Sequence, residues 1–147
     1  MNKRAPNPSI ENAVLLLSSS LAWLLILCLA VANGALREAV LIPSLGKSYG
    51  LVLSGGMLLL LVALVAYAFV RARRHTSPSQ GLFVGAYWLI LTLAFEFSFG
   101  RLVQHKSWAE LFDAYTFEDG NIWPVVLLVT LVAPYCAAVM RRRSSAG

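Results

Sequence analysis

Hydrophobic residues in this chain gather in four long, nearly continuous runs, and polar residues fill the segments between them. The runs cover about residues 13–36, 50–70, 81–100 and 122–140. A helix needs about 20 mostly apolar residues to cross a bilayer, so each run predicts a membrane-spanning helix. A transmembrane β-barrel would instead need segments of about ten residues with alternating polarity, and the stretch MLLLLVALVAYAFV does not alternate. The pattern therefore predicts an all-α integral membrane protein, a four-helix bundle of up-down topology.

Length and composition agree with this interpretation. The 147 residues are 59% hydrophobic and only 13% charged, whereas soluble domains contain about 45–50% apolar and about 25% charged residues. A water-soluble fold could not bury that much apolar surface. We expect a single transmembrane domain over residues 1–147, surrounded by the lipid bilayer.

The positions of lysine and arginine predict the orientation, because cytoplasmic connections of membrane proteins retain positive charge. The two termini and the second connection hold 8 of the 12 basic residues. These residues are Lys3, Arg4, Arg71, Arg73, Arg74, Arg141, Arg142 and Arg143. Both termini are therefore predicted to be cytoplasmic, with the first and third connections outside. The net charge of +5 then reflects topology and anionic lipid headgroups, and no nucleic-acid partner is expected.

The N-terminus has an alternative interpretation. The basic start MNKR, the apolar run and Ala30-Val31-Ala32 resemble a signal peptide that is cleaved before Asn33. However, the run is longer than the apolar core of such a peptide, which has about 7–15 residues. Its removal would also leave only three spans. We therefore expect the first run to remain as a span.

The third connection contains a short amphipathic helix, predicted over about residues 108–115. Ser107 and Glu110 have the spacing of a capping box, in which each side chain binds the backbone N–H of the other residue. Four bulky residues recur at helical spacing and therefore share one face: Trp108, Leu111, Phe112 and Tyr115. With Trp and Tyr at headgroup depth, this helix is predicted to lie in the membrane interface. It would either seal the end of the bundle or cover a site.

The third run contains a stripe of small and polar residues on one helical face. The stripe consists of Gly81, Gly85, Trp88, Thr92, Glu96 and Gly100. Such faces pack against other helices in lipid, so Glu96 is predicted to face protein. A carboxylate in mid-membrane costs about 2.5–3.5 kcal/mol on insertion scales, and it therefore needs a partner.

The first run supplies the predicted partner of Glu96. It runs in the same direction as the third run, so its end NGALRE reaches the same depth as Glu96. Arg37 could form a bidentate, charge-assisted hydrogen bond to this carboxylate. We therefore predict a polar cluster near the outer surface, roofed by Trp108. Its members are Asn33, Arg37, Glu38, Glu96, Arg101 and Trp108.

Two interpretations of this cluster stay open. Buried ion pairs can fix helix register and do nothing else. Alternatively, charges inside a membrane can mark the path of a ligand, a proton or a substrate. In the second case, two arginines beside a Trp would suit a phosphate or carboxylate head such as that of a lipid.

The sequence offers little catalytic chemistry. It has no phosphate-binding Gly-rich loop, HExxH motif or GxSxG motif, and we predict no catalytic residue, metal site or cofactor. Cys28 and Cys136 lie inside apolar runs without a CxxC pairing. They are predicted to be small core residues.

Several short motifs together resemble a group of small bacterial four-span integral membrane proteins without an assigned function. The motifs are NGALRE at 33–38, PSLG at 43–46, FEFSFG at 95–100, SW at 107–108, DAY at 113–115, G-x-x-W at 120–123 and Pro134. They fit the group's pattern of NGxxRE, FExxFG and SW…DxY. The chain departs from it at Thr116 and at Asn121-Ile122, where the group has Asn and a basic residue. The resemblance implies this fold and a bacterial cytoplasmic (inner) membrane, but no chemistry.

We expect an accessory or binding protein rather than an enzyme. An outward-facing polar pocket would take a lipid, a small amphiphile or a helix of a partner membrane protein or second copy. One alternative is a small proton-coupled transporter that uses Glu96, although few polar residues in the second and fourth runs could form a path. The other is a lipid-modifying membrane enzyme with Glu96 or His105 as its base.

Overall fold

The computed structural model describes residues 8–73 and 76–144, and these residues form helices and short connections. The elements are α1 (Pro8–Leu36), the π-helical η1 (Arg37–Leu41), α2 (Ile42–Leu45), α3 (Lys47–Ala72), α4 (Pro78–Leu102), α5 (Trp108–Asp113), the 3-10 turn η2 (Glu118–Gly120) and α6 (Trp123–Ser144). Lys3, Arg4 and Arg74, which contribute to the predicted orientation, lie outside the described residues.

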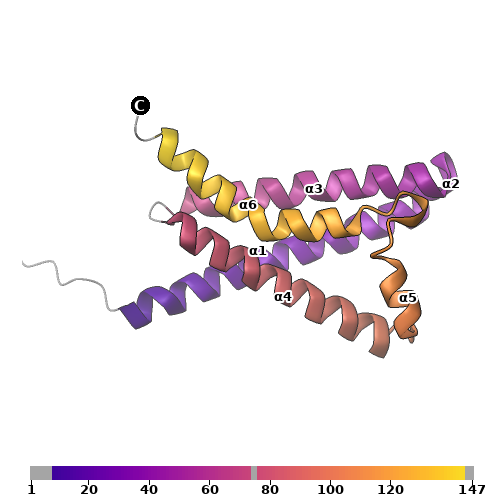
Figure 1. The fold of residues 1–147 in the computed structure, drawn as a ribbon, viewed down its shortest axis with the longest axis horizontal. Coiled ribbons are helices and arrows are strands. Elements are labelled where there is room, and N and C mark those ends of the chain that lie inside the picture. Colours follow the sequence, from indigo (N-terminus) through magenta and orange to yellow (C-terminus); the bar gives the residue numbers. More distant parts are fainter. Residues whose placement is uncertain (1–7, 74–75, 145–147) are drawn as a thin grey trace, which may run out of the picture.

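Four helical segments are long and apolar enough to cross a membrane: Ser9–Leu45, α3, α4 and α6. They alternate in direction, so α1 begins and α6 ends at the same end of the bundle (Figure 1). Large apolar side chains on their outer faces, such as Leu21, Leu60 and Ile90, are at least 60% exposed. Helices that are apolar on their outer as well as their inner faces are typical of membrane spans. The chain is therefore an all-α polytopic membrane protein, as its hydrophobic runs predict.

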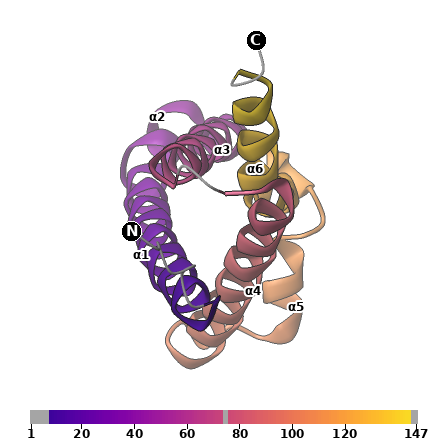
Figure 2. The ribbon, with the colours of Figure 1, turned by 90° about the vertical axis from the view of Figure 1, so that its left-hand side faces the viewer.

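The long helices are arranged in a ring in the order α1, α3, α6 and α4 (Figure 2). The packing of α4 on α6 is especially close, because Gly81 and Gly85 bring the α4 backbone against the backbone of Leu131 and Pro134. Both glycines are buried, which confirms that their stripe faces protein. Pro134 lies inside α6, and α6 changes direction along its length, as expected for an internal proline (Figure 1).

The first and third spans cross near their midpoints and separate on either side of the crossing (Figures 1 and 2). At the crossing, Ser20 Oγ and Tyr87 Oη share a hydrogen bond of 2.9 Å. Trp23 Nε1 donates to Thr92 Oγ1 at 3.1 Å. We call the end of the bundle that holds α2 and α5 the α5 end. Toward this end, α1 stays beside α3 while α4 diverges from it (Figure 1).

The half of the bundle away from the α5 end has a well-packed core. Ala66, Val70 and Trp88 are at most 1% exposed. The Trp88 ring packs edge-on against Phe69, with ring centres 5.6 Å apart. Its Nε1 donates to the carbonyl oxygen of Ser19 at 2.9 Å. The large Trp88 side chain therefore joins α1, α3 and α4 just beyond their crossing.

A guanidinium group holds the connection at this opposite end. Arg141 of α6 donates to the carbonyl oxygens of Val70 at 2.6 Å, Arg73 at 2.7 Å and Thr76 at 2.9 Å. Carbonyl groups in the last turn of a helix lack intrahelical partners. Arg141 therefore caps the C-terminus of α3 from a neighbouring span.

The first connection reverses the chain at Gly46. Its φ of 82° lies in the left-handed region that favours glycine. Before this turn, the helix passes through the π-helical η1. Pro43 has no N–H with which to bond the Ala39 carbonyl, so a regular α-helix could not continue with all of its bonds there. The π turn changes which way the side chains after Leu36 point.

The helix predicted over residues 108–115 is present as α5 and is two residues shorter. Its capping box is confirmed: Glu110 N donates to Ser107 Oγ at 3.3 Å, and Ser107 N donates to Glu110 Oε2 at 2.7 Å. Leu111 is buried against Gly100 of α4. Three aromatic rings, of Trp108, Phe112 and Tyr115, surround Phe97 with ring centres 5.8–6.3 Å from it. These contacts hold α5 against the end of α4.

Both cysteines are exposed, so the prediction that Cys28 and Cys136 are core residues is wrong. A span that is apolar on every side gives no pattern to tell the lipid-facing side from the core. A thiol behaves as a small hydrophobic group, and it is compatible with either position.

Candidate functional site

A cavity of about 410 Å³ lies between the four long helices in the α5 half of the bundle. Its inner end is formed by one residue of each long helix near the crossing: Trp23, Val62, Thr92 and Thr130. From there it extends to Lys106 and Asn121 at the α5 end. Small-molecule sites measure about 300–1,000 Å³. The divergence of α1 and α4 therefore leaves room for a small ligand.

The cavity opens sideways between α1 and α4. Val31 of α1 and Phe99 of α4 line it, yet they are 58% and 39% exposed. Phe99 stacks on Phe95 with ring centres 5.4 Å apart, and Phe95 also lines the cavity. The sides of membrane spans face acyl chains, so an opening between α1 and α4 would connect the cavity to lipid.

Glu96 lies on the α4 wall of this cavity and is half-buried. Tyr115 Oη donates to Glu96 Oε2 at 2.7 Å, and Trp123 Nε1 donates to the same oxygen at 2.9 Å. Both donors are neutral and bring no opposite charge to the carboxylate. Within residues 8–73 and 76–144, Oε1 of Glu96 accepts no hydrogen bond and Glu96 forms no ion pair.

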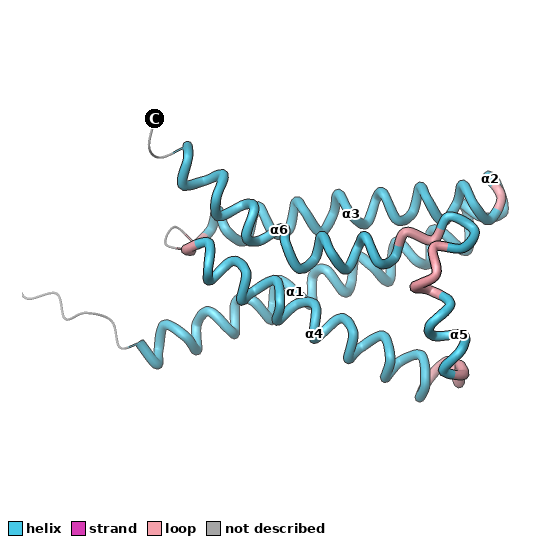
Figure 3. The backbone as a smooth tube through the Cα atoms, in the orientation of Figure 1, coloured by secondary structure: helices cyan, strands magenta, loops and turns pink. Residues whose placement is uncertain are grey.

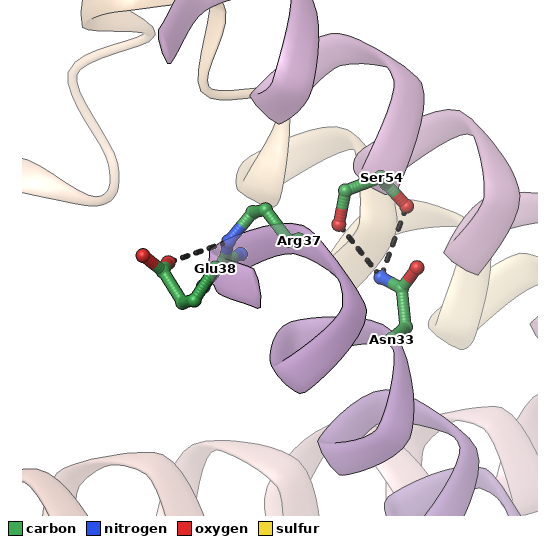
Figure 4. A network of polar contacts seen from close by, with 4 residues as sticks. All are labelled: Asn33, Arg37, Glu38 and Ser54. Atoms are coloured by element: carbon green, nitrogen blue, oxygen red, sulfur yellow. Dashed lines mark hydrogen bonds and ion pairs between the residues drawn. The ribbon is translucent and has the colours of Figure 1, made fainter. Parts of the chain in front are cut away.

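The predicted ion pair between Arg37 and Glu96 is wrong. Arg37 Nε instead donates to Glu38 Oε1 at 3.0 Å, within η1 (Figure 4). This end of the first span lies against α3, and α4 has diverged from it (Figures 1 and 3). Two spans that run in the same direction can reach the same depth whether or not they lie side by side. Sequence spacing cannot distinguish these two arrangements.

Asn33 forms part of the α1 wall and is only 6% exposed. Its Nδ2 donates to Ser54 Oγ at 2.8 Å and to the Ser54 carbonyl oxygen at 3.0 Å (Figure 4). Its Oδ1 is buried and has no hydrogen-bond partner in the part of the chain that the structure describes. An unpaired buried carbonyl costs about 1–3 kcal/mol. A donor that reached Asn33 from the cavity would remove this cost.

The six residues of the predicted cluster divide into two sets. Asn33, Arg37 and Glu96 line the cavity, whereas Glu38, Arg101 and Trp108 do not. Arg101 Nη1 donates to the carbonyl oxygen of Lys106 at 2.6 Å. Its guanidinium lies 5.3 Å from the centre of the Trp108 ring. The expected pair of arginines beside a Trp is therefore not formed, because Arg37 and Arg101 have separate partners.

The predicted cluster omits Tyr115, Trp123 and Ser54, although these three residues bond directly to Glu96 or Asn33. By its spacing, Tyr115 belongs to the apolar face of the interfacial helix, and Ser54 belongs to a contact between spans. The sequence motifs contained a signal for two of these residues, Tyr115 and Trp123. Tyr115 ends the DAY motif and Trp123 ends the G-x-x-W motif of the family resemblance, and the structure brings both to the Glu of FEFSFG.

Burial and then the hydrogen bond to Glu96 raise the pKa of Tyr115 above its ordinary value of 10.0. Burial disfavours the tyrosinate, and the neighbouring carboxylate binds the phenol in its protonated form. Tyr115 therefore remains a hydrogen-bond donor to Glu96 throughout the physiological range.

No three His, Cys, Asp or Glu side chains among the described residues gather in a way that could hold a metal ion.

Comparisons of the chain with family models, with curated proteins and with solved structures found no match. The resemblance to small bacterial four-span proteins therefore stays a prediction.

Proposed function

We propose that this protein is a non-enzymatic membrane protein that binds a lipid or another small amphiphile in the cavity at its α5 end. The proposal includes the predicted orientation, in which both termini are cytoplasmic and the α5 end faces outward from a bacterial inner membrane. In that orientation the cavity would receive molecules from the outer leaflet.

The observation that supports this proposal most directly is the shape of the cavity. It is open to lipid between Val31 and Phe99 and has apolar walls there. Two of its polar residues, Asn33 of α1 and Glu96 of α4, are more buried than this rim. An apolar entrance with a few polar groups inside is typical of sites for amphiphilic ligands. An acyl or alkyl chain could stay in the membrane while its head enters the cavity.

The inner end of the cavity argues against the transporter alternative. The lining stops near the crossing of α1 and α4, at Trp23 and Thr92. Beyond that level, Ala66, Val84 and Trp88 are fully buried. A substrate that entered from the α5 end would meet this packed core.

The proposal can be tested by filling the cavity with a side chain. Gly34 lines the cavity, and a Cβ at this position would have no neighbour within 4 Å. Gly34→Phe should therefore occupy the cavity without disturbing the fold. Gly56 is a matched control, because its Cβ also meets nothing within 4 Å and it lies outside the cavity.

Native mass spectrometry of the protein, extracted from a membrane in mild detergent, provides the measurement. We expect lipid-sized adducts on the wild type and on Gly56→Phe, and their loss from Gly34→Phe. Equal adducts on all three proteins would contradict the proposal. A partner protein or a second copy in the cavity would also contradict it. Such an occupant would appear as a much larger added mass that is present on the wild type and on Gly56→Phe and absent from Gly34→Phe.

A further inference from the structure

The pairing of the carboxylates at the α5 end indicates which head group the cavity selects. Glu38 pairs with Arg37 at 3.0 Å, and Asp119 pairs with Lys47 at 2.5 Å. The carboxylates that line the cavity are those of Glu96 and Glu110. Glu110 is used by its capping box, where Oε2 accepts bonds from both N and Oγ of Ser107. Of these two carboxylates, Glu96 is thus the one that caps no helix and keeps an oxygen without a hydrogen bond among the described residues.

The two donors to Glu96 fix its orientation and are both neutral, while Lys106, the basic residue that acts on this carboxylate through space, forms no direct ion pair with it. Tyr115 and Trp123 both bond to Oε2, so the carboxylate is held from one side. Oε1 stays available on a residue that lines the cavity. A carboxylate in an apolar site is stabilised strongly by a cation that can also donate a hydrogen bond to it.

Other parts of the cavity wall suit the same chemistry. Phe95 and Phe99 lie one residue before and three residues after Glu96 on α4, and both line the cavity. Aromatic rings near a cation attract it through their π faces. On the facing helix, the buried Oδ1 of Asn33 is an acceptor without a donor among the described residues. A carboxylate, two aromatic rings and an unpaired carbonyl all favour a cationic donor.

We propose that the cavity recognises amphiphiles with a primary ammonium head, and that Glu96 Oε1 is the counter-ion of that ammonium. This inference rests on the proposed function, because it names the class of ligand for the same cavity. Two sources share the chemistry. One is an aminophospholipid, whose phosphate could meet Arg37 or Lys106 at the edge of the cavity. The other is a simple alkylamine without a phosphate.

Binding of chain-matched probes separates the head group from the chain. We would titrate the detergent-solubilised protein with dodecylamine and with dodecanol, and measure binding by native mass spectrometry. The wild type should bind the amine about tenfold more tightly than the alcohol, which corresponds to one charge-assisted hydrogen bond. Phosphatidylethanolamine and phosphatidylglycerol form a second pair. Preference for the ethanolamine lipid would indicate an aminophospholipid, and preference for the amine in the first pair alone would indicate an alkylamine.

Variants then assign the preference to one residue. Glu96→Gln keeps an oxygen that can accept bonds from Tyr115 and Trp123, but it removes the charge. It should bind dodecylamine about as weakly as dodecanol, with dodecanol binding unchanged. Glu118→Gln is the control, because Glu118 is exposed at the same end and does not line the cavity. It should keep the wild-type preference.

The outcomes distinguish this inference from the proposed function. If the wild type binds amine and alcohol equally, and Gly34→Phe abolishes both, the ammonium inference is wrong and the amphiphile site stands. If none of the four probes binds the wild type, the proposed function fails as well. The wild-type comparison requires no variant, so equal binding of amine and alcohol would overturn the inference even if Glu96→Gln does not fold.

Discussion

The two halves of this bundle are built from the same four helices, yet one is packed and the other is hollow. Away from the α5 end, Trp88 and Ala66 are fully buried, and glycines bring α4 against α6. In the α5 half, α1 and α4 diverge around a cavity of about 410 Å³. Helices that cross at an angle must separate on either side of the contact. The opposite half fills the resulting space with side chains, and the α5 half leaves it open.

Each half contains a buried polar atom without a partner among the described residues, Ser19 Oγ in the packed half and Asn33 Oδ1 in the hollow half, but their other polar groups differ. Arg141 in the packed half satisfies three carbonyl oxygens at once. In the hollow half, Oε1 of Glu96 and Oδ1 of Asn33 have no partner within residues 8–73 and 76–144. Unpaired polar groups in a cavity wall are a costly way to hold a fold together, but they are suited to binding a ligand.

The largest expected effect is on the close contact of the packed half. A Cβ at Gly85 would overlap the backbone carbonyl of Leu131, which cannot rotate away. Gly85→Ala should therefore separate α4 from α6 and destabilise the protein by about 3 kcal/mol, at the upper end for overpacking. Unfolding by titration with sodium dodecyl sulfate measures the change.

Gly56→Ala is the control for this substitution, because a Cβ at Gly56 meets no atom within 4 Å. It should be neutral or stabilise the helix by up to about 1 kcal/mol. If the two alanine variants were equally stable, the tight contact between α4 and α6 would not hold the packed half together.

The next effect concerns the cap at the far end of the packed half. Arg141→Met removes the donor groups from three carbonyl oxygens, and should cost about 2 kcal/mol, as expected for hydrogen bonds from a charged group. Arg142→Met changes an exposed neighbour and should cost little. Similar unfolding curves for the two variants would show that Arg141 acts only through its charge.

A smaller effect is expected in the hollow half. Tyr115→Phe removes one hydrogen bond to Glu96 and keeps the ring that packs on Phe97. The free energy of unfolding should fall by about 1 kcal/mol. Tyr49→Phe, at a residue that is 77% exposed, should leave it unchanged. A loss as large as that of Gly85→Ala would mean that the hollow half is as tightly coupled as the packed one.

Alkaline pH tests the same hydrogen bond. The folded-state pKa of Tyr115 is raised above the ordinary 10.0 by burial and by Glu96. The unfolded chain therefore loses this proton first as the pH rises. The stability that Tyr115 contributes is fully present below pH 10.0 and is lost above it, as the pH rises through the folded-state pKa. Tyr115→Phe should lack that alkaline loss, and pH-dependent unfolding of the two proteins measures the difference.

The smallest effect is at the cap of α5. The backbone N–H of Ser107 and then its hydroxyl lower the pKa of Glu110 below its ordinary 4.5. A lowered folded-state pKa gives stability that is present above the ordinary pKa and is lost as the pH falls through the folded-state value. The stability difference between the wild type and Glu110→Ala should therefore shrink below pH 4.5. A difference independent of pH would mean that this carboxylate does not cap α5.

The sequence by itself determined the architecture. Four apolar runs determined four spans, because a backbone in lipid must satisfy its own hydrogen bonds within a helix. The stripe with Gly81 and Gly85 determined which face of α4 packs, since small residues allow close approach. The spacing of Ser107 and Glu110 determined the start of α5, because a capping box is a local interaction.

Only the tertiary structure decided the partners of the buried polar groups. The sequence predicts similar depths in the membrane for Arg37 and Glu96. The angle between α1 and α4 separates the two side chains, and Arg37 pairs with Glu38 instead. Glu96 instead meets Tyr115 and Trp123, from segments that fold back over the end of α4. Periodicity gives the face of each helix and its approximate depth. The lateral angle between helices comes from the packing of all four at once, and that angle determines both the pairing and the cavity.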